Sequence, residues 1–192
     1  MRIRLFYCGL RSINFLADMT NYLMLEVGQP MHAFDSRKVE KIRIKRFNEP
    51  FVFQTLDGID RNIDENTLMI CNDNTPVAIA GIMGGLDSEI VEDTSTLTLE
   101  SATFDAVSIR KSASRLAHRT DASMRYEKSL DPEMTVPAIA RFVKLLTDID
   151  NGAKVILENV TKGEKYELAY DYSDRQTAMI LDGGLLNYTK NI

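Results

Sequence analysis

The sequence predicts an α+β fold in which mixed sheets pack against helices, and three observations support that class. Between residues 40 and 100, short apolar runs are separated by turn-forming residues, which is typical of strands. Most of the region from 100 to 150 shows the apolar spacing of amphipathic helices instead. The two kinds of element do not alternate as regular βαβ units, which argues against a parallel α/β sheet.

The first expected element is a helix over residues 12–27, because its apolar side chains fall roughly on one stripe. Gly28-Gln29-Pro30 follows and is a typical helix stop. The segment after this stop contains His32, and we expect it to be a loop.

Strands are expected next. Residues 42–47 alternate apolar and basic side chains, as a half-exposed strand does. The run 51–56 leads into Asp57-Gly58, a dipeptide favoured in tight hairpin turns, and residues 61–63 form the return strand. Three further short apolar runs are expected to be strands: 68–71, 77–80 and 97–99.

Helices dominate the region after residue 100. We expect them over 104–116, over 122–130 and over 136–149, the last being the clearest amphipathic pattern. Thr120 and Asp121 precede the second helix as plausible N-caps. Two more strands are expected at the end of this region: 155–160 and 166–170.

Composition limits the class of protein. The 192 residues are 44% hydrophobic and 27% charged, which excludes a disordered tail and a coiled coil. No apolar run approaches the roughly 20 residues needed to cross a bilayer, and the N-terminus is a poor secretory signal. A net charge of −5 restricts any nucleic-acid contact to a local patch. Cys8 and Cys71, without metal-type spacing, fit a reducing compartment, so we expect a cytoplasmic protein.

The most unusual stretch is the glycine cluster Ala78–Gly85. It lacks the spacing of a phosphate-binding loop. Two interpretations stay open from the residues alone. One is a tight strand connection that needs positive φ, and the other is backbone exposed to a ligand where no side chain fits.

Isolated polar residues also allow both a structural and a functional interpretation. Glu100 ends an apolar strand, where a carboxylate is either solvated, paired or hydrogen-bonded to a ligand. His32 and His118 are the two histidines, and with no cysteine cluster beside them a zinc site is not expected. A local positive stretch suits either solvated helix faces or phosphate contacts: Arg110, Lys111, Arg115, Arg119, Arg125 and Lys128.

Five stretches in the same order resemble the β subunit of bacterial phenylalanyl-tRNA synthetase. They cover residues from about 10 to about 150, and the matching region is the editing domain, often called B3/B4. Each stretch alone is weak evidence, but five in order are specific. The stretches are Thr20–Asp35, Thr55–Gly58, Ala78–Gly85, Leu99–Ala102 and Arg119–Glu127.

The resemblance implies a B3/B4-like editing domain over residues 1–157 and a C-terminal extension or linker over 158–192. It also implies hydrolysis of tyrosine mischarged onto the phenylalanine tRNA, inside a ligase that attaches phenylalanine using ATP. A pocket shaped for Phe rejects one added hydroxyl only weakly. A second site that must hydrogen-bond that hydroxyl rejects Phe much more strongly.

Site residues follow from the resemblance, position by position. Glu100 matches the carboxylate that accepts the tyrosine hydroxyl, and His32 matches the histidine near the scissile ester. Thr120 and Ala122 match the pocket wall, where a larger side chain in place of Ala122 occludes the amino acid. The full implied set is His32, Glu100 and Thr120 as catalytic residues and Asn21, Ala80, Gly81, Glu100 and Ala122 as substrate-binding residues, with no metal ligand.

The implied partners are the tyrosine-carrying acceptor end of tRNA(Phe) and, through other domains, the synthetase α subunit, with no membrane. No cofactor is expected here, while ATP and Mg serve the parent enzyme. A non-catalytic tRNA-docking or scaffolding domain of the same subunit is the alternative. A stand-alone editing protein is a third hypothesis, against which the start at Met1, within the family's preceding helix, argues.

Overall fold

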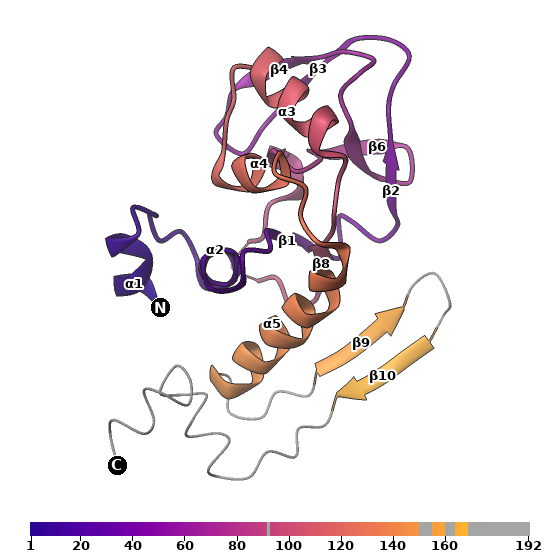
Figure 1. The fold of residues 1–192 in the computed structure, drawn as a ribbon. Helices are drawn as coiled ribbons and strands as arrows, with labels where there is room; N and C mark the ends of the chain where they lie inside the picture. The colour runs from indigo at the N-terminus through magenta and orange to yellow at the C-terminus, as the bar shows by residue number, and fades with distance from the viewer. Residues whose placement is uncertain (92, 150–154, 160–163, 169–192) are drawn as a thin grey trace. The chain divides into compact units, whose positions relative to one another are not determined.

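Figure 1 shows the chain in a computed structural model, which describes residues 1–91, 93–149, 155–159 and 164–168. The chain divides into two compact units, Met1–Asn151 and Gly152–Ile192, and each is described by itself. The first unit combines helices with several antiparallel sheets, which confirms the predicted α+β class.

Two helices open the first unit. The sequence pattern did not indicate α1 (Arg2–Tyr7), whereas α2 (Phe15–Val27) lies inside the predicted helix. The start of α2 is later than expected because the Asn14 side chain caps it, accepting a 2.9 Å hydrogen bond from the Ala17 N–H. The helix ends at Gly28, whose φ of 78° is the left-handed conformation that glycine adopts readily, so the predicted stop is confirmed.

The segment after α2 is a strand, β1 (Met31–Asp35), and the loop predicted around His32 is wrong. Its partner is β8 (Leu97–Ser101), which pairs with it antiparallel from far along the chain. A short strand of mixed composition is stabilised by hydrogen bonds to its partner and not by a local apolar pattern. The residues of β1 therefore carry little strand signal of their own.

A four-stranded antiparallel sheet in the order β2-β5-β6-β7 and a two-stranded hairpin, β3-β4, form the rest of the sheet structure in this unit. The hairpin turns at Asp57 and Gly58, as predicted. A 2.6 Å ion pair from Arg61 to Asp57 ties the turn to the return strand. The strands are β2 (Ile42–Lys45), β3 (Phe51–Gln54), β4 (Asp60–Ile63), β5 (Met69–Asn72), β6 (Thr75–Ile79) and β7 (Met83–Gly84).

Helices follow β8 where the sequence predicts them. Thr120 is the N-cap of α4, because its hydroxyl oxygen accepts a 3.1 Å hydrogen bond from the Ser123 N–H. The helix that follows is shorter than the predicted run 122–130. The elements are α3 (Ala106–Arg115), α4 (Asp121–Tyr126) and α5 (Thr135–Ile149), with short 3₁₀ turns η1 (Leu86–Ser88) and η2 (Pro132–Met134).

The β1–β8 pair separates two apolar clusters, because neighbouring residues in a strand point to opposite faces. Phe34 belongs to the larger cluster, which also contains residues of the four-stranded sheet, α3 and α4. His32 shares the face of Phe34, and so does Glu100 opposite it. The smaller cluster on the other face joins the pair to α2 and α5: Met19, Leu23, Met31, Leu97, Leu99 and Phe142.

In the second unit, β9 (Val155–Asn159) pairs antiparallel with β10 (Glu164–Leu168). The strands predicted over 155–160 and 166–170 overlap these two, and residues 160, 169 and 170 lie outside the described residues. Most of the predicted C-terminal extension, 158–192, also lies outside them. The boundary after residue 157 stays a prediction.

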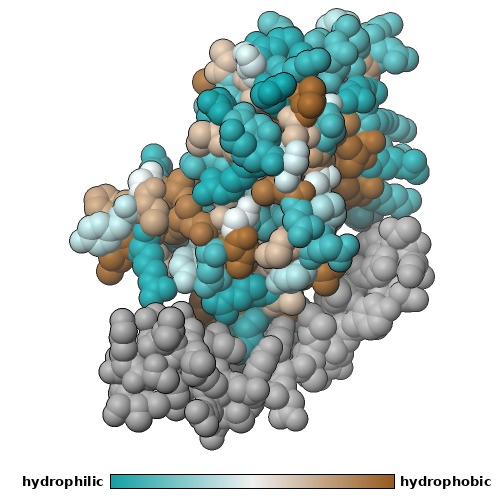
Figure 2. All heavy atoms as spheres, in the orientation of Figure 1, coloured by the Kyte–Doolittle hydropathy of each residue, from teal (hydrophilic) through white to brown (hydrophobic). Residues whose placement is uncertain are grey.

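Apolar side chains are exposed on α1. Ile3 and Phe6 are 73% and 75% exposed, and Figure 2 shows apolar residues at the left, where α1 lies in Figure 1. Leu5 is the buried residue of this helix. None of the helices in the described parts of the chain has the length and apolar character to span a membrane.

Candidate functional site

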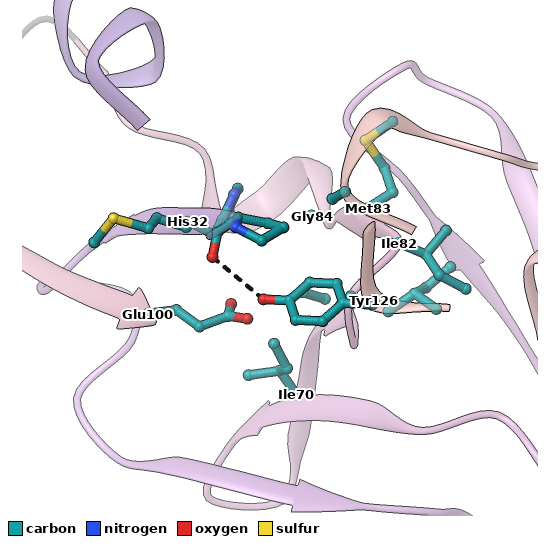
Figure 3. Close-up of a pocket in the computed structure, with 13 residues that line it drawn as sticks. His32, Ile70, Ile82, Met83, Gly84, Glu100 and Tyr126 are labelled. Carbon is teal, nitrogen blue, oxygen red and sulfur yellow. Dashed lines mark hydrogen bonds between the residues drawn. The ribbon is translucent and has the colours of Figure 1, made fainter. Parts of the chain in front are cut away.

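A pocket opens on the face of the β1–β8 pair that carries His32 and Glu100 (Figure 3). It holds about 360 Å³ of empty space, including the part that meets solvent. The pocket is lined by Pro30, Met31, His32, Ile70, Ala78, Ile79, Gly81, Ile82, Met83, Gly84, Glu100, Ala122 and Tyr126.

His32 and Glu100 are direct partners in the antiparallel register of β1 and β8. Directly opposite residues project from the same face of a sheet, so both side chains line the pocket. The His32 ring packs edge-on against Phe34 with its centroid 4.5 Å away, which restrains the imidazole. Among the described residues, no hydrogen bond or ion pair engages either the imidazole or the Glu100 carboxyl.

Burial shifts the pKa values of Glu100 and His32 in opposite directions. Desolvation raises the pKa of the Glu100 carboxyl to about 8, because the ionised form loses its hydration. The same cause lowers the pKa of the His32 imidazole to about 4. At pH 7 the acid form of Glu100 and the neutral form of His32 therefore prevail, and the pocket offers hydrogen-bonding groups without net charge.

Stability should therefore depend on pH through Glu100. Its pKa is higher in the folded state than the ordinary 4.5, so the favourable contribution is complete below about pH 4.5 and disappears as the pH rises to about 8. We expect Glu100→Gln to match the unaltered chain near pH 4 and to exceed its free energy of unfolding by about 1–3 kcal/mol at pH 9. Urea denaturation at both pH values measures this difference. The exposed control Glu49→Gln should show no such trend, and an equal difference at both pH values contradicts the assignment.

The glycine cluster forms a second wall of the pocket, beside His32. Gly81 has a φ of 65°, and a Cβ there would lie 2.9 Å from the Tyr126 ring. A Cβ on Gly84 would lie 2.9 Å from the His32 imidazole. The segment is thus a tight strand connection between β6 and β7, and it is also backbone that approaches site residues too closely for a side chain. The tight strand connection is confirmed, and the interpretation as ligand-facing backbone stays a prediction.

The third wall comes from α4. Ala122 and Tyr126 lie one turn apart on that helix, so both reach the pocket. The hydroxyl of Thr120 donates a 2.9 Å hydrogen bond to the Ile82 carbonyl, which joins the start of α4 to the glycine turn. Thr120 therefore positions the helix and does not itself line the pocket.

The structure brings four of the predicted site residues to one pocket and leaves three outside its lining. His32, Gly81, Glu100 and Ala122 line it. Asn21 lies on α2, and Ala80 is buried with its N–H donating to the Leu68 carbonyl, so neither these two nor Thr120 is in the lining.

Tyr126 lines the pocket although the sequence reasoning did not assign it a role. Its place four residues after Ala122 was a usable signal, because residues at that spacing share one helix face. Gly84 is a second such residue, and its position inside the glycine cluster pointed to it.

The positive stretch is largely engaged with carboxylates. Arg115 pairs with Asp64 at 2.6 Å, Arg125 pairs with Asp121 at 3.4 Å, and Arg119 pairs with Glu127. Arg110 and Lys111 are exposed. In the parts of the chain that the structure describes, no group of three or more His, Cys, Asp or Glu side chains is placed to hold a metal ion.

Comparisons with a domain family and with individual proteins point to the same family. The sequence profile of the B3/4 domain matches residues 1–151. A phenylalanine–tRNA ligase beta subunit from Clostridium acetobutylicum is 46% identical over 180 residues, 90% of this chain and 22% of that protein. The beta subunit from Syntrophus aciditrophicus is 49% identical over 154 residues, 79% of this chain and 19% of that protein.

A third relative, from Staphylococcus aureus, is 40% identical over 166 residues, 85% of this chain and 21% of that beta subunit. The chain therefore spans about a fifth of the length of these relatives. Residues 1–151 contain every residue that lines the pocket described above. The chain belongs to the B3/4 domain family and is homologous to part of the phenylalanine–tRNA ligase beta subunit.

Proposed function

We propose that this chain is the editing module of a phenylalanine–tRNA ligase and hydrolyses the ester of Tyr-tRNA(Phe). The observation that carries the proposal is the juxtaposition of Glu100 and His32 across β1 and β8 in one pocket. The Glu100 carboxyl is suited to recognise a hydroxyl, and the His32 imidazole is suited to hold a water molecule near an ester.

Recognition depends on a Glu100 oxygen that is free to accept a hydrogen bond. The surrounding wall is largely apolar, with Ile70, Ile82 and the Tyr126 ring in its lining. A tyrosine side chain in this pocket donates its hydroxyl proton to that oxygen in a hydrogen bond. Phenylalanine occupies the same space but leaves the oxygen desolvated and without a donor, which opposes its binding.

Hydrolysis needs no covalent nucleophile in this arrangement. The neutral imidazole of His32 has an unprotonated nitrogen that accepts a hydrogen bond from water and orients it toward the ester carbonyl. A pKa of about 4 makes His32 a weak base, which favours this orienting role over full proton removal. Catalysis is then a matter of positioning, assisted by backbone amides and by the terminal ribose of the tRNA.

The partners and cofactors of the whole enzyme belong to the same proposal. The substrate end is the acceptor stem of tRNA(Phe), and the synthetase α subunit, ATP and Mg act through regions of the relatives that this chain does not span. Exposed Arg110 and Lys111 favour a second candidate, a tRNA-docking domain without hydrolysis.

The decisive experiment grafts the chain in place of the matching region of the Clostridium acetobutylicum beta subunit and assays the assembled ligase. We expect deacylation of Tyr-tRNA(Phe) at a rate at least about 100 times that of Phe-tRNA(Phe). Equal hydrolysis of both substrates contradicts the discrimination that we assign to Glu100. Binding of tRNA without hydrolysis of either substrate supports the docking alternative instead.

A further inference from the structure

Tyr126 is held in one orientation. The side chain is 2% exposed, and its ring packs against Phe104 with the centroids 5.1 Å apart. Its hydroxyl donates a hydrogen bond to the Pro30 carbonyl at 3.3 Å, drawn as the dashed line in Figure 3. The Gln29 amide donates to that same carbonyl at 3.1 Å and to the Ala102 carbonyl at 2.8 Å, which fixes the acceptor in place.

The Tyr126 oxygen consequently faces the pocket as a hydrogen-bond acceptor. A phenol has one hydroxyl proton, and Tyr126 uses it in the hydrogen bond to the Pro30 carbonyl. Figure 3 shows the carboxyl of Glu100 directed toward this oxygen, and both residues line the pocket. Burial raises the pKa of Tyr126, and the charge of Glu100 raises it further, as expected for two close groups.

Glu100 has no cation to stabilise its ionised form in the described part of the chain. The titratable groups that face it there are His32 from β1 and Tyr126 from α4. His32 is neutral at pH 7, and Tyr126 presents lone pairs. An ionised carboxylate facing those lone pairs is repelled, whereas a carboxylic acid donates its proton to them.

We propose that Tyr126 is the positioning residue for hydroxyl recognition: it accepts a hydrogen bond from the acid form of Glu100 and leaves the carbonyl oxygen of that group free for a substrate hydroxyl. This role rests on the proposed function and adds its specificity determinant. The chain of donors then has one direction, from the substrate phenol to Glu100, to Tyr126, to the Pro30 carbonyl. The site selects a hydrogen-bond donor at the para position of the substrate ring.

The proposal makes a prediction that separates a neutral acid from a carboxylate. The amide of Glu100→Gln has an N–H for Tyr126 and a carbonyl for the phenol, so it reproduces the acid form of Glu100. Binding of p-cresol and of toluene to the full chain, measured by titration calorimetry, tests this without tRNA. We expect the preference for p-cresol to stay within about threefold in Glu100→Gln and to fall about tenfold in Tyr126→Phe.

A second readout distinguishes positioning from stability alone. Carbon-detected NMR of the Glu100 carboxyl, identified by its loss in Glu100→Gln, follows its titration. In Tyr126→Phe we expect the midpoint to fall below that of the unaltered chain, because the acceptor that we assign to the acid form is gone. Tyr7→Phe, a change of the same kind at an 83% exposed residue, should alter neither readout.

The outcomes are separable. An unchanged midpoint and an unchanged preference in Tyr126→Phe overturn the role of Tyr126. Loss of the preference in Glu100→Gln, or equal binding of p-cresol and toluene by the unaltered chain, overturns the neutral-acid geometry. If the grafted ligase does not hydrolyse Tyr-tRNA(Phe) while both readouts respond as expected, the proposed function fails and the role of Tyr126 in hydroxyl recognition stands.

Discussion

Replacing Ala122 by Trp is expected to reduce hydrolysis of Tyr-tRNA(Phe) by the grafted ligase at least about 100-fold. Ala122 lies in the first turn of α4 and its methyl group lines the pocket, so an indole there fills the space that the tyrosine ring needs. The residue is only half-buried, which leaves the larger side chain room to extend without breaking the core. Single-turnover deacylation with saturating enzyme measures the loss.

Met124→Trp is the matched control. It adds an indole to the same helix at a residue that is 40% exposed and does not line the pocket. Its deacylation rate should stay within about twofold of the unaltered protein. An Ala122→Trp variant that folds and still hydrolyses Tyr-tRNA(Phe) at the normal rate removes this pocket as the site of the reaction.

The second large effect is expected on selectivity, for Glu100→Ala. The substitution removes the Glu100 carboxyl, which is the only partner that we assign to the tyrosine hydroxyl. Tyrosine would then bind with its hydroxyl unpaired, while phenylalanine would no longer leave a buried carboxyl without a donor. We expect the ratio of kcat/KM for Tyr-tRNA(Phe) over Phe-tRNA(Phe) to fall at least about 100-fold. Most of the change should be a loss of tyrosine hydrolysis.

The comparison of Glu100→Ala with Glu49→Ala controls for loss of an acidic residue, because Glu49 is exposed in the turn before β3. Thermal unfolding of both variants at pH 7 checks that the fold is retained. Loss of the carboxyl in Glu100→Ala should not by itself lower the stability, since burial penalises the ionised form of this group. A selectivity ratio that is unchanged in Glu100→Ala excludes Glu100 as the hydroxyl partner.

Local signals in the chain predicted much of the fold. The stop at Gly28 and the hairpin turn at Asp57 and Gly58 depend on backbone conformations that these residue types favour by themselves. Thr120 caps α4 by a contact within one turn of chain. Such interactions span a few residues, so they are readable from neighbours in the sequence.

The family and four residues of the pocket also came from the sequence, through ordered stretches that resemble one family. His32, Gly81, Glu100 and Ala122 meet in the structure although they are spread over four of those stretches. The same comparison did not indicate Tyr126, because its role depends on what its hydroxyl contacts and not on its residue type.

Only the tertiary structure decided that His32 lies in a strand opposite Glu100 and that Tyr126 and not Thr120 lines the pocket. It also decided that burial raises the pKa of Glu100 and lowers the pKa of His32. The sequence by itself determined the class of fold, the helix ends and the set of candidate residues. The physical reason for the difference is how far apart in the sequence the interacting residues lie. Capping and turn formation are local, whereas strand pairing and desolvation depend on residues that only folding brings together.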